Sequence, residues 1–373
     1  MAASDATEPP GHPTHAFSRT DRSQFGLWWW TVDHWLLGAT LALIGLGVLL
    51  SFGSSPAAAF RLDIAFPFHF AVRQSIFAVG GVAILLMVSS LSPRGVRRTA
   101  FFVYLVSIAL MIALVFLGHA AKGATRWVEI AGFTLQPSEF MKPALIVLIA
   151  WMFSEGQKGE GVPGVSIAFG TAFWMAGVPM SWVMVLGGMA VAGLTSTYFM
   201  FQHVASRVDR FFSHDKTMDT HQVDRAGQAI AAGGLFGRGP GEGIMKREVP
   251  DMHTDFIYSA SAEEYGLWFS LILIALFMFL TLRGLFKAMR LSDPFEQVAA
   301  AGLFVLVGTQ AFINMAVNLN LIPTKGMTLP FISYGGSSML AMGLTMGMAL
   351  ALTRRRPGAY APSKGFAKAG AFA

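Results

Sequence analysis

The chain has 373 residues, of which 54% are hydrophobic and only 13% are charged, and it contains no cysteine. Soluble domains carry about 25% charged residues, so this composition predicts a chain that lies mainly in lipid. The lack of cysteine excludes disulfides and thiolate metal sites. The net charge of +6 comes from basic loops beside apolar runs, which is typical of membrane topology rather than of a nucleic-acid surface.

The N-terminal residues 1–34 are predicted to form a cytoplasmic tail. The first part, to about Arg22, is rich in Pro, Ser, Thr and His, which favours disorder. It is too polar, and too long before the first apolar run, to be a cleaved signal peptide.

Apolar runs follow along most of the chain, and two of them are short for a full crossing of the bilayer, at 140–153 and 165–180. The nine runs cover about Trp35–Ser54, Phe70–Ser90, Phe101–Gly118, Phe140–Phe153, Val165–Met180, Trp182–Phe201, Leu267–Leu282, Val298–Val317 and Met327–Leu352. We therefore expect an all-α polytopic membrane protein, with a membrane domain over residues 35–353 and a cytoplasmic tail over residues 354–373.

Three groups of basic residues lie beside these runs, at Arg94–Arg98, Arg283–Arg290 and Arg354–Arg356. The positive-inside rule places all three in the cytoplasm. Nine full crossings would put the second and third groups outside, so we expect Val165–Phe201 to make a net single crossing. Residues 202–264 then form a large periplasmic loop.

This loop contains a predicted helix at Arg225–Leu235, followed by the glycine-rich stretch Gly233–Gly243. Glycine permits tight turns with positive φ. The stretch fits a flexible linker and a structured loop beside a site equally well.

Polar residues gather in a first group between the third and fourth runs. Lys122, Arg126 and Trp127 precede Glu139 and Lys142, which are three residues apart and so share one helix face. An interfacial tryptophan anchor with basic side chains that reach the headgroups explains the pattern. A cationic site for an anionic lipid headgroup explains it too, because ionisable residues within a span are costly and usually functional.

A second group extends from Lys246 to Asp255 and ends where apolar sequence begins. A partly desolvated carboxylate at Asp255 could act as a general base. An N-cap of the following helix is the structural alternative. A metal site formed with Asp251 and His253 has no specific spacing to support it.

A third group, Pro323–Ser338, combines two prolines with the pair Gly335-Gly336. This composition predicts a broken helix, which lines protein or a watery cavity when it lies at membrane depth. Close helix packing through small residues is the alternative.

Taken in order, these stretches resemble the motifs of the SEDS family (shape, elongation, division and sporulation proteins). The matching stretches are Lys122–Lys142, Gly233–Gly266 and Pro323–Ser338, and the resemblance covers about Trp35 to Arg356. The form Lys325-Gly-Met-Thr-Leu resembles the cell-division branch. The family implies a SEDS-type bundle in the bacterial inner membrane, at the division septum, and a peptidoglycan glycosyltransferase that polymerises lipid II on the periplasmic face.

The resemblance also implies roles for individual residues. The family's catalytic aspartate falls on Asp255. Its substrate-binding residues fall on Lys122, Arg126, Glu139, Lys142, Lys246, Ser333, Tyr334, Gly335, Gly336 and Ser337. Implied partners are lipid II, a class B penicillin-binding protein (FtsI-like) and other division proteins.

A single carboxylate suits this chemistry, because the acceptor hydroxyl needs a base and the displacement inverts the anomeric centre. The lipid diphosphate leaving group needs its charge neutralised, by Arg, by Lys or by a divalent cation such as Mg²⁺ or Mn²⁺. No residue is assigned as a metal ligand. A lipid II flippase is an alternative function, because transporters also have broken helices and intramembrane charges.

One segment of the family pattern is missing. The family commonly has ten spanning helices and a Pro-Asp-x-Gly motif near the fifth, and that motif is absent between Phe153 and Phe201. About one helix, roughly 25–30 residues, is expected to be absent. A non-catalytic division scaffold is therefore a third reading.

Overall fold

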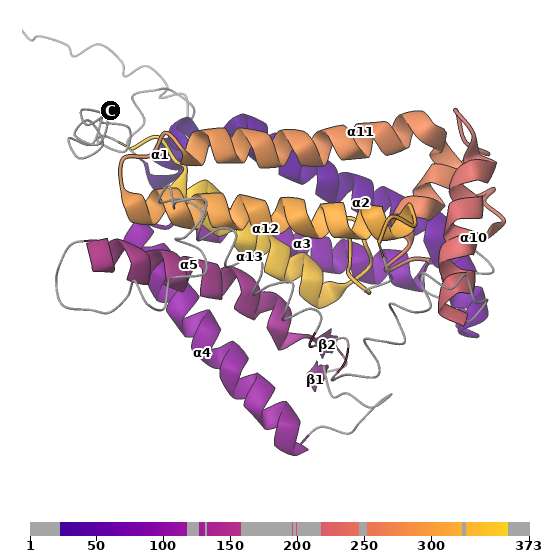
Figure 1. The fold of residues 1–373 in the computed structure, drawn as a ribbon, viewed down its shortest axis with the longest axis horizontal. Coiled ribbons are helices and arrows are strands. Elements are labelled where there is room, and N and C mark those ends of the chain that lie inside the picture. Colours follow the sequence, from indigo (N-terminus) through magenta and orange to yellow (C-terminus); the bar gives the residue numbers. More distant parts are fainter. Residues whose placement is uncertain are drawn as a thin grey trace, which may run out of the picture.

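The computed structural model describes residues 23–117, 127–130, 133–157, 196, 199, 218–245, 252–322 and 326–356. These residues form a helical bundle, as the sequence predicts (Figure 1). Its main helices are α2 (His34–Arg61), α3 (His69–Ser89), α4 (Pro93–Leu117), α5 (Pro137–Gln157), α11 (Ile257–Ala288), α12 (Pro294–Asn318) and α13 (Gly336–Leu352).

Among the described helices, five are long and apolar enough to cross a membrane: α2, α3, α4, α11 and α12. Helix α13 is shorter because residues 326–335, expected to open the last apolar run, are not helical. Phe331 in this segment has a φ of 65°, which an α-helix cannot contain. The predicted broken helix is confirmed.

Helix α13 lies at the centre of the bundle. Nearly all of its residues are buried, as expected for a helix that is apolar on every side. Glycines let it approach α3 closely: a Cβ on Gly343 would lie 2.4 Å from the carbonyl oxygen of Gly81. Small residues of this kind bring helix backbones together in membranes.

The three basic groups meet at one end of the bundle, which we call the basic end. Arg356 donates to the carbonyl of Leu91 between α3 and α4 (2.8 Å), and the Arg97 guanidinium lies 4.2 Å from the ring centroid of Phe295 at the start of α12. Arg283 pairs with Asp33, which caps α2. This is the end that the positive-inside rule predicts to be cytoplasmic.

The described segments on either side of 158–217 lie at opposite ends of the bundle. Helix α5 ends at the basic end, where Glu155 pairs with Arg97 (3.5 Å). Helix α10 (Met218–Gly233), which includes most of the predicted helix Arg225–Leu235, lies across the other end (Figure 1). This change of end is what a net single crossing requires. The predicted run Val165–Met180 lies outside the described residues, as does almost all of Trp182–Phe201.

Two expected boundaries need correction. Helix α1 (Gln24–Thr31) is held by a hydrogen bond from the Trp28 indole to Ser89 (2.9 Å), so the N-terminal tail cannot extend to residue 34. Helix α11 begins at Ile257, inside the expected loop 202–264. The described part of the chain also contains a short hairpin, β1 (Val128–Ile130) paired with β2 (Phe133–Leu135), within an otherwise helical fold.

Candidate active site

Asp255 lies in a turn just before α11, at the end opposite the basic end, and it is partly buried. The N-cap of α11 is Phe256, and no side chain caps that helix. The structural alternative for Asp255, an N-cap, is therefore excluded by the geometry.

The main chain of Asp255 is fixed by two buried amides of α12. Asn314 Nδ2 donates to the Asp255 carbonyl (2.9 Å) and to the Met327 carbonyl (2.6 Å). Asn318 Nδ2 donates to the same Asp255 carbonyl (3.0 Å), while its Oδ1 accepts from the Ser259 hydroxyl (2.7 Å). Because both amides are buried, these bonds form in a low dielectric, where they orient a loop firmly.

The broken segment 326–335 lies against the Asp255 turn. Tyr334 N donates to the His253 carbonyl (3.0 Å). A Cβ built on Gly326 would lie 3.3 Å from Asp255 Oδ2, so the carboxylate faces the start of this segment. The predicted second and third polar groups, far apart in sequence, are thus brought together.

An aromatic cluster and a buried glutamine hold the segment in place. The rings of Phe70, His253 and Tyr334 lie within 4.8–5.6 Å of one another, centroid to centroid. Gln74 donates to the Ser333 carbonyl (3.2 Å) and accepts from Gly335 N (3.3 Å).

Two of the predicted substrate-binding residues, Ser333 and Gly336, are explained by contacts within the protein. Ser333 is 3% exposed, and its hydroxyl accepts from Leu329 N (2.7 Å) within the turn. A Cβ on Gly336 would overlap the Phe77 ring at 2.4 Å, which explains the glycine by packing. Ser337 is also buried, whereas Tyr334 and Gly335 are partly exposed.

The glycine-rich stretch is a structured loop rather than a flexible linker. Glu263 of α11 is fully buried, and its Oε1 accepts from Ile244 N (2.7 Å) and Met245 N (3.1 Å) and pairs with Arg238 (3.5 Å). These contacts fix the loop immediately before Lys246, a predicted substrate residue outside the described residues.

Glu139 and Lys142 form the predicted same-face pair in the first turn of α5, with an Nζ–Oε1 distance of 2.7 Å. Glu139 Oε2 is buried and has no hydrogen-bond partner among the described residues. Helix α5 ends at the basic end, where Glu155 pairs with Arg97, so its start points toward the end of the bundle that holds Asp255.

Three predicted residues, Lys122, Arg126 and Lys246, lie outside the described residues. Within the described part of the chain, no group of three or more His, Cys, Asp or Glu side chains is arranged to hold a metal ion.

The predicted site omitted the polar face of α12, made by Gln310, Asn314 and Asn318. The three residues recur at intervals of four in an apolar helix, so they share one face. Polar residues within a span are rare and usually have a role. This four-residue spacing of polar side chains was the signal in the sequence that could have identified them.

Comparison with known proteins supplies the family. A model of the cell cycle proteins FtsW, RodA and SpoVE matches residues 34–163 and 159–357. A relative from Caulobacter vibrioides, named "probable peptidoglycan glycosyltransferase FtsW", is 67% identical over 95% of this chain and 97% of its own length. The chain therefore belongs to the family of the cell cycle proteins FtsW, RodA and SpoVE. A Geobacter metallireducens relative with the same name is 35% identical over 87% of this chain and 95% of its own.

Two solved structures share the fold of this chain. A chain from a structure described as "structural coordination of polymerization and crosslinking by a peptidoglycan synthase complex" has a TM-score of 0.68 at 22% identity, covering 86% of this chain and 97% of that one. Thermus thermophilus RodA has a TM-score of 0.55 at 24% identity, covering 87% and 97%.

The comparisons also bear on the segment that the family pattern contains and this chain is predicted to lack. The family model matches in two pieces that meet at residues 159–163. The Caulobacter alignment has 379 positions but includes 95% of a 373-residue chain, which leaves about 25 positions unmatched, close to the length of one spanning helix. Both findings support the predicted absence of one helix.

Proposed function

We propose that this chain is a peptidoglycan glycosyltransferase that polymerises lipid II into glycan strands during septal wall synthesis. The observation that carries the proposal is the Asp255 turn. One partly buried carboxylate is fixed through its own main chain by two buried asparagines, and it faces the broken segment 326–335. The name of the 67% identical Caulobacter relative supports the same activity.

Asp255 acts as the general base in this proposal. It accepts the proton of the acceptor sugar hydroxyl as that oxygen attacks the anomeric carbon of the donor. The bond from that carbon to the diphosphate oxygen breaks, the diphosphate leaves with the electron pair, and the anomeric centre is inverted. An anchored main chain suits this role, because a displacement of about 1 Å at a reacting group can cost about 100-fold in rate.

The leaving group needs positive charge rather than a second acid, since a diphosphate is already a stable anion. Lys142 supplies such a charge: its side chain is 34% exposed and is oriented by Glu139. Lys122, Arg126 and Lys246 are proposed to add to it.

The proposed setting is the bacterial inner membrane at the division septum, with the Asp255 end in the periplasm. The proposed partners are lipid II and a class B penicillin-binding protein that cross-links the new strands. The similarity to a chain of a peptidoglycan synthase complex that coordinates polymerisation with crosslinking supports such a pairing.

The deciding experiment is lipid II polymerisation by the purified full-length chain with its cognate transpeptidase. Asp255→Asn should abolish glycan strands, because the amide cannot accept the proton. Asp224→Asn is the matched control: it removes an exposed carboxylate from α10 at the same end and should polymerise normally.

The other outcomes identify the alternatives. An Asp255→Asn variant that polymerises like the wild type would overturn the base assignment. Transbilayer movement of lipid II without polymerisation would favour a flippase. Partner binding with neither activity would indicate a scaffold that has lost function with the missing segment.

A further inference from the structure

A groove on the outer face of α11 at the basic end combines an apolar stripe with a cationic end, and it has a volume of about 830 Å³. Met278, Leu282 and Phe286 recur every four residues, so they form one stripe along the helix. All three are large side chains with 45–62% of their surface exposed. The groove ends at Arg283, Lys287, Arg290 and Arg355.

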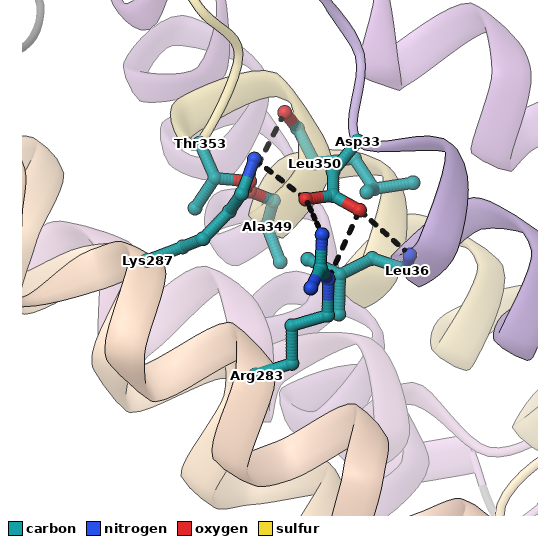
Figure 2. A network of polar contacts seen from close by, with 7 residues as sticks. All are labelled: Asp33, Leu36, Arg283, Lys287, Ala349, Leu350 and Thr353. Atoms are coloured by element: carbon teal, nitrogen blue, oxygen red, sulfur yellow. Dashed lines mark hydrogen bonds and ion pairs between the residues drawn. The ribbon is translucent and has the colours of Figure 1, made fainter.

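The cationic end carries more positive than negative charge. Asp33 accepts from Lys287 (2.6 Å) and Arg283 (3.0 Å), so one carboxylate is shared by two cations (Figure 2). Arg290 and Arg355 are exposed, and no ion pair joins either to an acid within the described part of the chain. Four cations and one carboxylate leave a net charge of +3.

The positive-inside rule explains why basic residues lie at this end, but it does not explain why they sit at the end of an apolar groove. A ligand that fills the groove must match both its apolar stripe and its cationic end. A free phosphate would fill only the cationic end, whereas a phospholipid places its acyl chains on the stripe and its phosphate among the cations.

We propose that this groove binds an anionic phospholipid of the leaflet at the basic end. Arg290 and Arg355 contact its phosphate. Asp33 holds Arg283 and Lys287 in position beside them, while the exposed stripe of α11 contacts the acyl chains.

The test measures phosphatidylglycerol binding to the purified full-length chain in detergent, by native mass spectrometry and by the lipid-induced rise in thermal midpoint. Arg290→Gln/Arg355→Gln should weaken binding about 25-fold, at about fivefold for each cation removed. Its midpoint without lipid should match the wild type, because both side chains are exposed.

Arg94→Gln/Arg98→Gln is the matched control, since it removes two exposed charges from the same end but outside the groove. It should bind phosphatidylglycerol like the wild type. Phosphatidylcholine and inorganic phosphate should give no comparable binding or shift. Equal binding by the groove variant and the wild type, equal weakening by both variants, or an equal shift with inorganic phosphate would overturn the proposal.

Discussion

At the scale of single residues, the geometry of the candidate site depends on side chains that hold the main chain of Asp255. Asn314 joins the turn that carries Asp255 to the broken segment, because one amide nitrogen donates to carbonyls of both. Asn318 adds a second donor to the Asp255 carbonyl. Buried carbonyls that lose their donor cost about 1–3 kcal/mol, so the native turn conformation depends on these amides.

Asn314→Leu should therefore slow polymerisation by about 10- to 100-fold, because Asp255 loses its fixed position. The thermal midpoint in detergent should fall as well, by an amount equivalent to about 1–3 kcal/mol. Gln297→Leu is the control, since it makes a similar change near the start of the same helix, at the basic end. Wild-type rates from Asn314→Leu would rule out a positioning role.

At the scale of elements, the two ends of α11 contact different parts of the protein. Near its start it is broken at Gly266, which has a φ of 78° and ψ of −174°. A Cβ there would lie 2.4 Å from Gly237 N and 2.6 Å from the Leu235 carbonyl, so the break is where the glycine-rich loop packs.

Gly266→Ala should prevent this packing, because the added methyl group would overlap backbone atoms that cannot move aside. Both the thermal stability and the polymerisation rate should fall greatly. Gly241→Ala is a matched control: Gly241 also has positive φ (84°) but nothing within 4 Å of a Cβ. Gly241→Ala should lower the free energy of unfolding only by the strain of placing alanine in a left-handed backbone conformation, about 1–2 kcal/mol. Thermal midpoints and polymerisation rates of the two variants, measured together, check this; equal effects would contradict it.

The other end of α11 is tied to α2 by Asp33, which lies just outside the spanning segment (Figure 2). Burial raises the pKa of Asp33, but hydrogen bonds from Lys287, Arg283 and Leu36 N outweigh it and lower the pKa from 3.8 to about 2. The folded state therefore favours the ionised carboxylate. Its contribution to stability is present above about pH 4 and is lost as pH falls through about 2.

Asp33→Asn should lower the thermal midpoint, since it leaves Arg283 and Lys287 without their carboxylate. The difference from the wild type should stay constant from pH 8 to pH 5 and shrink only below about pH 4. Thermal scans across this pH series check the prediction. A difference that vanishes by pH 6 would show that Asp33 is not the group responsible.

At the scale of the whole molecule, the two ends of the bundle are chemically distinct. Basic side chains from α4, α11 and the C-terminal segment meet at one end. Helix α10 lies at the other end (Figure 1), where the glycine-rich loop packs on the start of α11, just after Asp255. If the basic end is cytoplasmic, the proposed chemistry faces the periplasm.

Because the chain has no cysteine, single cysteines can report this orientation without background. A membrane-impermeant maleimide should label Glu242→Cys, an exposed position in the glycine-rich loop, in intact spheroplasts. Arg98→Cys, exposed at the basic end, should react only after permeabilisation. The reverse pattern would invert the topology and place Asp255 in the cytoplasm.

Apolar runs, charge asymmetry and motifs are local properties of the chain, so the amino-acid sequence was enough to predict the membrane fold, the basic end, the broken helix before α13 and the family. The folded structure was needed to show that Asp255 is not the N-cap of α11, that the glycine-rich stretch is a packed loop and that the Ser333 hydroxyl accepts a hydrogen bond within its own turn. It also revealed that Asn314 and Asn318 hold the Asp255 turn. These facts depend on local backbone geometry or on contacts between residues 19 to 63 positions apart. Periodicity and composition do not say which distant residues meet.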